Sequence, residues 1–220
     1  MHKGANQNRL LLLGGLVVLT LAVSFCARWT PRFPGDLQLT LLLQSIDNGL
    51  LRSVMEWSSF LFGGWRAALF VVAGAAVAWW RLGRLEGAAV LVAGLVSLVD
   101  SALKVAVNRP RPTPDLVRVF VAENESGFPS GHALFAAVVL GTLAYFIATH
   151  VRKRSLRLLS LAGLLLLIVS IGVSRVYLGV HWPSDVIGGY LVGGVLLATL
   201  IWFYERWKDH LRARESGGDG

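Results

Sequence analysis

The sequence predicts an all-α, polytopic membrane protein, in which six transmembrane helices form a bundle within a single membrane domain over residues 1–220. Of the 220 residues, 55% are hydrophobic and 15% are charged, and the mean hydropathy is +0.60. Ordinary soluble domains carry about 25% charged residues, and a soluble core could not bury this much apolar surface. The apolar residues also gather in long runs separated by short basic segments, as in membrane proteins.

Six apolar segments are long enough to cross a bilayer, which requires about 20 mostly apolar residues per helix. They are approximately residues 10–27, 60–80, 87–107, 132–149, 156–176 and 185–204. The first segment has a basic start, so a cleaved signal peptide is the alternative to a first transmembrane helix. Its apolar run is long for a signal peptide and no clean A-x-A site follows it, which favours a retained helix.

The basic residues predict the orientation. Lys3 and Arg9 precede the first span, and further basic clusters lie between spans two and three, between spans four and five, and after span six. With six spans these segments all face one side, which the positive-inside rule identifies as the cytoplasm. We therefore expect a multi-pass protein of the cell membrane with both termini in the cytoplasm. The net charge of +8 reflects this topology, so no nucleic-acid partner is expected.

The first outer loop, residues 28–59, is not uniformly polar and predicts an amphipathic helix between spans one and two. Its apolar row comprises Leu43, Ile46, Leu50, Val54 and Met55, and the opposite row comprises Gln44, Asp47, Asn48 and Arg52. Such a helix either lies in the membrane interface or packs against the bundle, and both interpretations stay open.

Three polar clusters fall at the outer ends of spans three to six, where topology alone predicts few basic residues. They are residues 104–112 (KVAVNRPRP), 129–132 (PSGH) and 174–185 (SRVYLGVHWPSD). Lys104, Arg111 and Arg175 supply cationic donors, and a guanidinium group binds phosphate oxygens in pairs. Ser130 and Gly131 immediately precede span four, where a serine can cap the helix and the helix N-terminus favours a bound anion. These features predict a phosphate site.

Two histidines and an aspartate complete this group of residues. Asp185 lies four residues after His181, a spacing that permits contact at a helix start. An aspartate that holds one ring N–H leaves the other ring nitrogen as a nucleophile. His132 is then a candidate general acid for a leaving alkoxide. The clusters do not bring together the several carboxylates that a metal pair needs, so neither a metal nor a cofactor is expected. The cations must then neutralise the phosphoryl charge.

Other charged residues lie near the clusters. Asp100 is one helical turn before Lys104 and is expected to pair with it, because an intramembrane carboxylate needs a partner. Arg109 either helps to bind phosphate or meets lipid head groups. Glu123 and Glu125 are interpreted as loop acids, with repulsion of a second anionic ligand as the alternative.

Together these residues resemble the complete three-part signature of the type 2 phosphatidic acid phosphatase superfamily. The first part is Lys104, six residues, then Arg111-Pro112; the second is Pro129-Ser130-Gly131-His132; the third is Ser174-Arg175, five residues, His181, three residues, then Asp185. The signature spans residues 104–185, and the resemblance covers about residues 87–204. Each part alone is weak, but all three in order at this spacing are specific. The six-span count agrees with the membrane branch of the superfamily.

The resemblance implies a role for each signature residue. His181 would attack phosphorus and form a phosphohistidine, Asp185 would orient His181, and His132 would protonate the departing lipid oxygen. The phosphoryl oxygens would be held by Lys104, Arg111, Arg175, Ser130 and the backbone of Gly131. Water would then release phosphate, and no metal is implied.

The expected function is hydrolysis of a lipid phosphomonoester or diphosphate on the extracytoplasmic face. Undecaprenyl diphosphate, phosphatidylglycerophosphate and phosphatidate all fit, and the expected partners are this lipid phosphate and the bilayer. One alternative is a phosphotransferase that discharges the same phosphohistidine onto an acceptor, which product analysis would separate. The other is a non-catalytic lipid-phosphate binder or transporter, against which the complete set of His132, His181 and Asp185 argues.

Overall fold

The computed structural model describes residues 2–217, with side chains described from residue 10 to residue 214, so that Lys3 and Arg9 lie outside the described side chains. Within this range every regular element is helical, which confirms the predicted all-α class. The elements are α1 (His2–Trp29), α2 (Asp36–Gln44), α3 (Gly49–Leu61), α4 (Trp65–Arg81), α5 (Arg84–Val96), α6 (Val99–Val107), α7 (Gly131–Phe135), the π-helical segment η1 (Ala136–Leu140), α8 (Gly141–His150), α9 (Arg154–Tyr177) and α10 (Pro183–Gly217).

The spanning helices match the predicted segments closely. In the described part of the chain, five stretches are long and apolar enough to cross a membrane: Leu10–Trp29, Arg84–Val107, Gly131–His150, Arg154–Tyr177 and Pro183–Arg214. The remaining predicted span, residues 60–80, is not one straight helix, because α3 and α4 meet at an angle of 69°. Gly64 lies at this bend with a φ of 57°, which an L side chain rarely adopts. Counting the bent pair as one span gives the predicted six.

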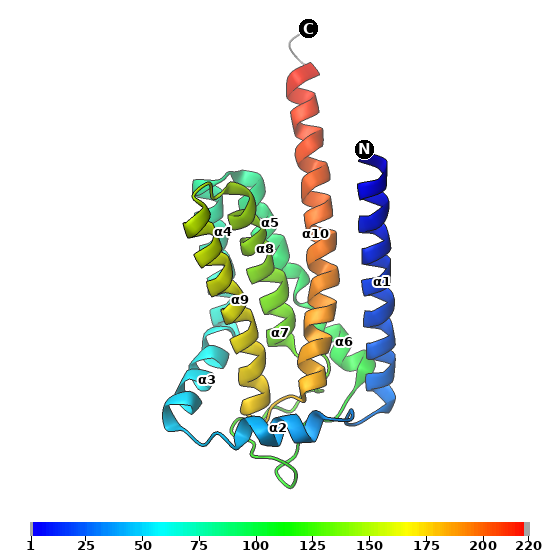
Figure 1. Ribbon diagram of the computed structural model, residues 1–220, viewed down its shortest axis with the longest axis vertical. Coiled ribbons are helices and arrows are strands. Elements are labelled where there is room, and N and C mark those ends of the chain that lie inside the picture. The colour runs from blue at the N-terminus through cyan, green and yellow to red at the C-terminus, as the bar shows by residue number, and fades with distance from the viewer. Residues whose placement is uncertain (1, 218–220) are drawn as a thin grey trace.

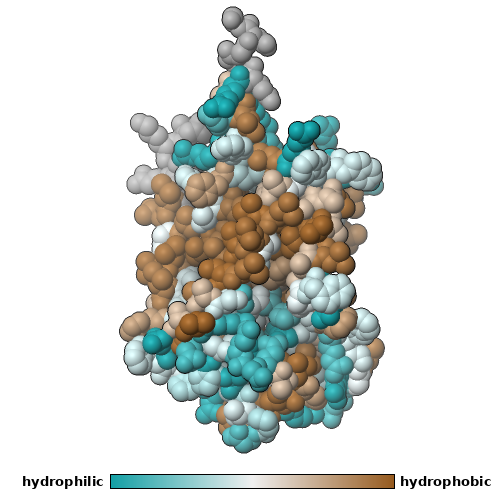
Figure 2. Space-filling view, turned by 180° about the vertical axis from the view of Figure 1, so that it is seen from behind, coloured by the Kyte–Doolittle hydropathy of each residue, from teal (hydrophilic) through white to brown (hydrophobic). Residues whose placement is uncertain are grey.

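The surface and the chain ends fit a multi-pass protein. Figure 2 shows a hydrophobic band across the middle of the molecule, with hydrophilic residues gathered at both ends. In Figure 1 both termini lie at one end of the bundle, as an even number of crossings requires, and α2 lies across the opposite end.

The predicted amphipathic segment is two helices instead of one. The break falls at residues 45–48, and Asn48 starts α3 as its N-cap by accepting hydrogen bonds from the backbone N–H groups of Leu50 and Leu51. The expected polar row is also wrong in part, because Gln44 is buried. Its amide nitrogen donates to the carbonyl oxygens of Arg118 (2.7 Å) and Tyr177 (2.9 Å). Both α2 and α3 contact α9, so this segment packs against the bundle.

The α7–η1–α8 span is the centre of the core. In its most apolar window 56% of residues are buried, compared with 28% in α10 and 6% in α1. Helix α10 packs closely against it at Gly189 and Gly193, where a Cβ atom would lie 2.6 Å from the Ser130 carbonyl oxygen and 2.6 Å from the Ala137 Cβ respectively. Small residues spaced four apart let two membrane helices approach closely. This contact sets the start of α7 beside the start of α10.

Candidate active site

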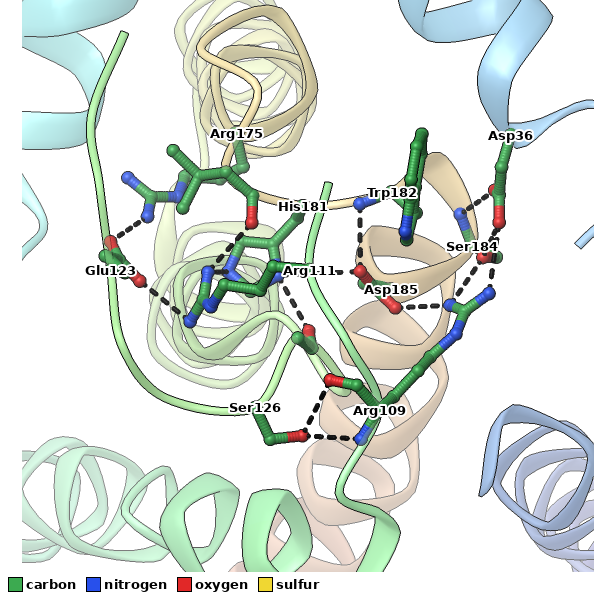
Figure 3. Close-up of polar contacts among 12 residues, drawn as sticks. Asp36, Arg109, Arg111, Glu123, Ser126, Arg175, His181, Trp182, Ser184 and Asp185 are labelled. Atoms are coloured by element: carbon green, nitrogen blue, oxygen red, sulfur yellow. Dashed lines mark hydrogen bonds and ion pairs between the residues drawn. The ribbon is translucent and has the colours of Figure 1, made fainter. Parts of the chain in front are cut away.

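The three sequence clusters meet at the end of the bundle opposite the chain termini (Figures 1 and 3). The backbone N–H of Ser130, just before α7, donates to the carbonyl oxygen of Asp185 in the first turn of α10 at 3.0 Å. From the loop after α6, Arg111 Nη1 reaches His181 Nε2 at 3.2 Å. All three parts of the signature therefore contribute to one site, as the sequence predicts.

Three buried or nearly buried cations face two loop carboxylates. Glu123 lies between Arg111 and Arg175: one oxygen is 2.8 Å from Arg111 Nη2, and the other pairs with Arg175 Nη2 (Figure 3). A carboxylate oxygen of Glu125 is 2.7 Å from Lys104 Nζ. The interpretation of Glu123 and Glu125 as plain loop acids is therefore wrong, because both are ion-paired within the site.

These ion pairs keep the two carboxyl groups charged. Burial raises the pKa of Glu123, but the guanidinium groups of Arg175 and Arg111 outweigh it and bring that pKa down to about 2. A hydrogen bond from Lys104 lowers the pKa of Glu125 as well. At neutral pH the loop thus presents two anions to three cations.

Three polar atoms in the site are buried without a hydrogen-bond partner. One of them, Arg111 Nη2, still has an ion-pair partner in Glu123, whereas Ser130 Oγ and Arg175 Nε have neither. A buried donor or hydroxyl without a partner costs free energy, so such atoms point to a ligand. Ser130 occupies the N-cap position of α7, as expected, but its hydroxyl makes no capping hydrogen bond. A phosphate oxygen is a suitable acceptor for both atoms.

His181 has a defined tautomer. Its Nδ1 donates to the carbonyl oxygen of Gly127 at 2.7 Å, which leaves the lone pair on Nε2, the nitrogen that faces Arg111. Burial lowers the pKa of His181 well below its ordinary value, and the charges of Arg111 and Arg175 lower it further. The ring is therefore neutral at physiological pH, which a nucleophilic imidazole must be.

Asp185 does not hold His181 directly. Its Oδ2 lies 3.8 Å from His181 Nδ1, which is beyond hydrogen-bond range, and it accepts instead from the backbone N–H of Trp182 at 2.8 Å. Its Oδ1 pairs with Arg109 (Figure 3). The direct Asp185–His181 contact expected from their spacing is replaced by the Gly127 carbonyl, because the loop before α7 lies against the ring.

Arg109 fits neither predicted alternative. It is 1% exposed and belongs to a buried network, so it contacts neither phosphate nor lipid head groups. Its guanidinium binds Asp185 and also Asp36 Oδ2 at 3.1 Å, while Nη1 donates to Ser184 Oγ at 2.8 Å. Asp36 in turn accepts from the backbone N–H of Ser184 at 2.9 Å. The first turns of α2 and α10 are thus joined through one arginine.

His132 lies at the start of α7, but its hydrogen bond is to α3. The Nε2 atom donates to the carbonyl oxygen of Ser59 at 3.1 Å, and the hydroxyl of the same serine accepts from Arg175 Nη1. Ser59 therefore connects His132 with Arg175.

The expected Asp100–Lys104 pair is present, with 3.1 Å between Asp100 Oδ2 and Lys104 Nζ. The carboxylate lies directly against Gly131, where a Cβ atom would collide with Asp100 Oδ2 and would lie 3.7 Å from Lys104 Nζ. A side chain at position 131 would displace the Asp100 carboxylate, so glycine lets the α7 backbone and this ion pair approach closely.

Sequence reasoning missed three contributors to the site: Asp36, Ser59 and Gly127. Asp36 and Ser59 lie in the first outer loop, residues 28–59, whose apolar spacing predicts an amphipathic helix. No local pattern there marks either residue as polar and buried. Gly127 acts through its carbonyl oxygen, for which residue type carries no signal. One sequence signal could have identified Asp36: a carboxylate next to Pro34-Gly35 in an apolar protein needs a partner if it is buried.

Comparison with known proteins agrees with this geometry. Residues 86–209 match the PAP2 superfamily. Phosphatidylglycerophosphatase B of Bacillus subtilis is 35% identical over 154 residues, which cover 69% of this chain and 71% of the relative. Lipid phosphate phosphatase delta of Arabidopsis thaliana is 25% identical over 83% of this chain, but the match spans only 45% of that relative.

Among solved structures, the fold is similar to the crystal structure of a transmembrane PAP2-type phosphatidylglycerolphosphate phosphatase from Bacillus subtilis. The two chains are 27% identical and superpose with a TM-score of 0.75. The match covers 88% of this chain and 96% of the other.

Proposed function

The chain belongs to the PAP2 superfamily and is a lipid phosphate hydrolase, and from this premise we propose that it cleaves a lipid phosphomonoester or diphosphate through a phosphohistidine. His181 Nε2 attacks phosphorus, so that an N–P bond forms as the P–O bond to the lipid breaks. His132 gives a proton to the leaving oxygen. Water then attacks phosphorus as the N–P bond breaks and its electron pair returns to His181 Nε2, His132 takes a proton from that water, and inorganic phosphate is released.

The other signature residues bind and position. Lys104, Arg111 and Arg175 hold the phosphoryl oxygens and balance the charge that grows in the pentacoordinate state. Ser130 Oγ and the backbone of Gly131 complete the phosphate contacts. Asp185 positions the start of α10, and Gly127 fixes the His181 tautomer.

One observation carries the proposal: the Nε2 lone pair of the buried His181 is directed at the cationic cluster. Its Nε2 lies 3.2 Å from Arg111 Nη1, and the unpartnered Arg175 Nε and Ser130 Oγ belong to the same site. A phosphoryl group bound by these donors would face the nucleophile.

We place the site on the extracytoplasmic face, because the basic segments flank its opposite end. The candidate substrates are phosphatidylglycerophosphate, undecaprenyl diphosphate and phosphatidate. The name of the Bacillus subtilis relative makes phosphatidylglycerophosphate the first to test.

The test is phosphate release by purified protein in detergent with a chelator present, using each of the three lipids. The variants are His181→Ala and, as a matched control, His210→Ala, which lies near the chain end outside the site. We expect release by the wild type and His210→Ala, and a loss of about 10⁴-fold or more in His181→Ala, since removing a covalent nucleophile leaves only binding and electrostatic catalysis.

Retained activity in His181→Ala would contradict the phosphohistidine. A strict requirement for a divalent metal would contradict the metal-independent mechanism. Transfer of phosphate to an added acceptor, with little release into water, would identify the phosphotransferase instead.

A further inference from the structure

The phosphate-binding cations are already bound by anions of the same chain. Glu123 bridges Arg111 and Arg175 (Figure 3), and Glu125 pairs with Lys104. Each cation to which the proposed function assigns phosphate therefore has a carboxylate partner. A carboxylate across two guanidinium groups uses the same donor geometry as two phosphate oxygens. Phosphate and the two glutamates cannot bind these donors together.

The glutamates lie on the outer side of the site. The side chains of Arg175, Arg111 and Lys104 are 2%, 9% and 13% exposed, whereas those of Glu123 and Glu125 are 32% and 70% exposed. An incoming phosphate therefore replaces the carboxylates from the solvent side while the cations stay in place.

The backbone of this loop is held independently of the two carboxylates. The Glu125 carbonyl accepts from Arg111 Nε at 2.6 Å, the Gly127 carbonyl accepts from His181, and the Gly127 N–H donates to the Arg109 carbonyl at 2.8 Å. The side chains can thus rotate outward while the loop remains attached. A group tethered in this way competes at an effective concentration on the order of mM or more.

We propose that Glu123 and Glu125 are built-in competitors of phosphate: their carboxylates occupy the phosphate site between turnovers and displace the product phosphate from it. The proposal rests on the proposed function. After the phosphohistidine is hydrolysed, inorganic phosphate lies among three cations, an arrangement that holds it tightly. Return of the two carboxylates replaces its contacts one by one, so that phosphate leaves and the cations are never left without a partner.

The test is the affinity for inorganic phosphate. Glu123→Gln and Glu125→Gln keep side-chain size but remove the competing charge. Glu56→Gln is the control, because Glu56 lies outside the site and pairs with Arg52 in an exposed i,i+4 contact. The dissociation constant is measured by calorimetry in detergent, and the inhibition constant by competition with phosphatidate hydrolysis. If the phosphate site is free of carboxylates in about a tenth of molecules, removal of the competing carboxylate tightens phosphate binding about tenfold.

We expect tighter phosphate binding and a lower KM in both glutamine variants, with Glu56→Gln unchanged. A merely structural role for the glutamates would weaken phosphate binding or leave it unchanged, and either result overturns the proposal, as does a lack of phosphate binding in every variant. Glu125 is mostly exposed, so Glu125→Gln keeps the test valid if Glu123→Gln does not fold.

Hydrolysis by the wild type without tighter phosphate binding in the variants would reject the competitor role alone, whereas no hydrolysis by the wild type would reject the proposed function.

Discussion

At the scale of single residues, the neutral state of His181 is the feature on which the chemistry depends. The ring is buried, donates from Nδ1 to the Gly127 carbonyl, and faces the charges of Arg111 and Arg175. Burial and the two positive charges all disfavour the protonated form, so His181 needs no deprotonation step at neutral pH to act as the proposed nucleophile. The positive charge of this site must be balanced by anions, and Glu123 and Glu125 provide them.

The depressed pKa of His181 predicts its titration directly. Because the pKa lies well below the ordinary value, we expect the His181 ring resonances to stay unchanged between about pH 7.5 and about pH 6, where an unperturbed imidazole becomes protonated. The measurement is two-dimensional NMR of histidine-labelled protein in detergent, with the His181 signals assigned by their loss in His181→Ala. A midpoint near the ordinary histidine value would contradict the neutral tautomer.

Arg109 shows how one residue can support a site without contacting its ligand. Removing it leaves the carboxylates of Asp36 and Asp185 buried without their common cation. We expect Arg109→Ala to lower the free energy of unfolding by about 3–5 kcal/mol, since breaking a buried ion pair on one side strands a charge. The control Arg52→Ala should cost less than about 1 kcal/mol, because its pair with Glu56 is exposed.

Thermal unfolding in detergent measures both variants. Equal, small losses for Arg109→Ala and Arg52→Ala would mean that the network does not hold α2 to α10.

At the scale of helices, the approach of α10 to α7 sets the geometry of the site. Gly189 lies where any side chain would meet the Ser130 carbonyl and the Ala133 Cβ, 2.6 Å and 2.9 Å from the position of a Cβ. These atoms belong to the turn that presents Ser130 and Gly131. Packing of the second turn of α10 against the start of α7 therefore controls the positions of these signature residues.

Gly189→Ala tests this dependence. We expect a loss of about 1–3 kcal/mol in stability from overpacking, together with reduced kcat, because α7 must shift away from α10. Gly163→Ala on α9 is the matched control, since a Cβ there meets nothing within 4 Å. Melting temperature and phosphatidate hydrolysis are measured for both. Full activity in Gly189→Ala would show that the site tolerates a wider helix separation.

At the scale of the whole molecule, the termini and the site lie at opposite ends of a bundle with an apolar middle. The fold therefore separates a basic end from the end that holds the candidate site, and under the proposed orientation the basic end faces the cytoplasm. If the apolar middle lies in the bilayer as proposed, a lipid phosphate would present its head group near the ends at which α7 and α10 begin.

Cysteine labelling in cells tests the orientation. Cys26 is the single cysteine and is exposed, so Cys26→Ala gives a background without thiols. In that background we expect a membrane-impermeant maleimide to label Asp115→Cys, in the loop beside the site, in intact cells. Arg212→Cys, near the end of α10, should react only after lysis. The reverse pattern would place the site in the cytoplasm.

The sequence by itself determined the helical class, the membrane spans and the residues of the three-part signature. Hydropathy and motif spacing are local properties, and a spanning helix needs only a continuous apolar run to be recognised. The same local view missed the bend at Gly64, because a hydropathy window does not register backbone conformation. It also predicted one amphipathic helix where Asn48 starts a second.

Only the tertiary structure decided which polar groups are partners. Asp36 and Ser184 are 148 residues apart in the chain, and Arg109 and Asp185 are 76 apart, so no spacing rule connects them. His181 and Asp185 lie 3.8 Å apart, but the hydrogen bond expected between them is not made, because a loop from elsewhere in the chain supplies a nearer acceptor, the Gly127 carbonyl. Hydrogen-bond partners in a buried site are chosen by distance in space, which the packing of α7, α10 and the loop between α6 and α7 establishes.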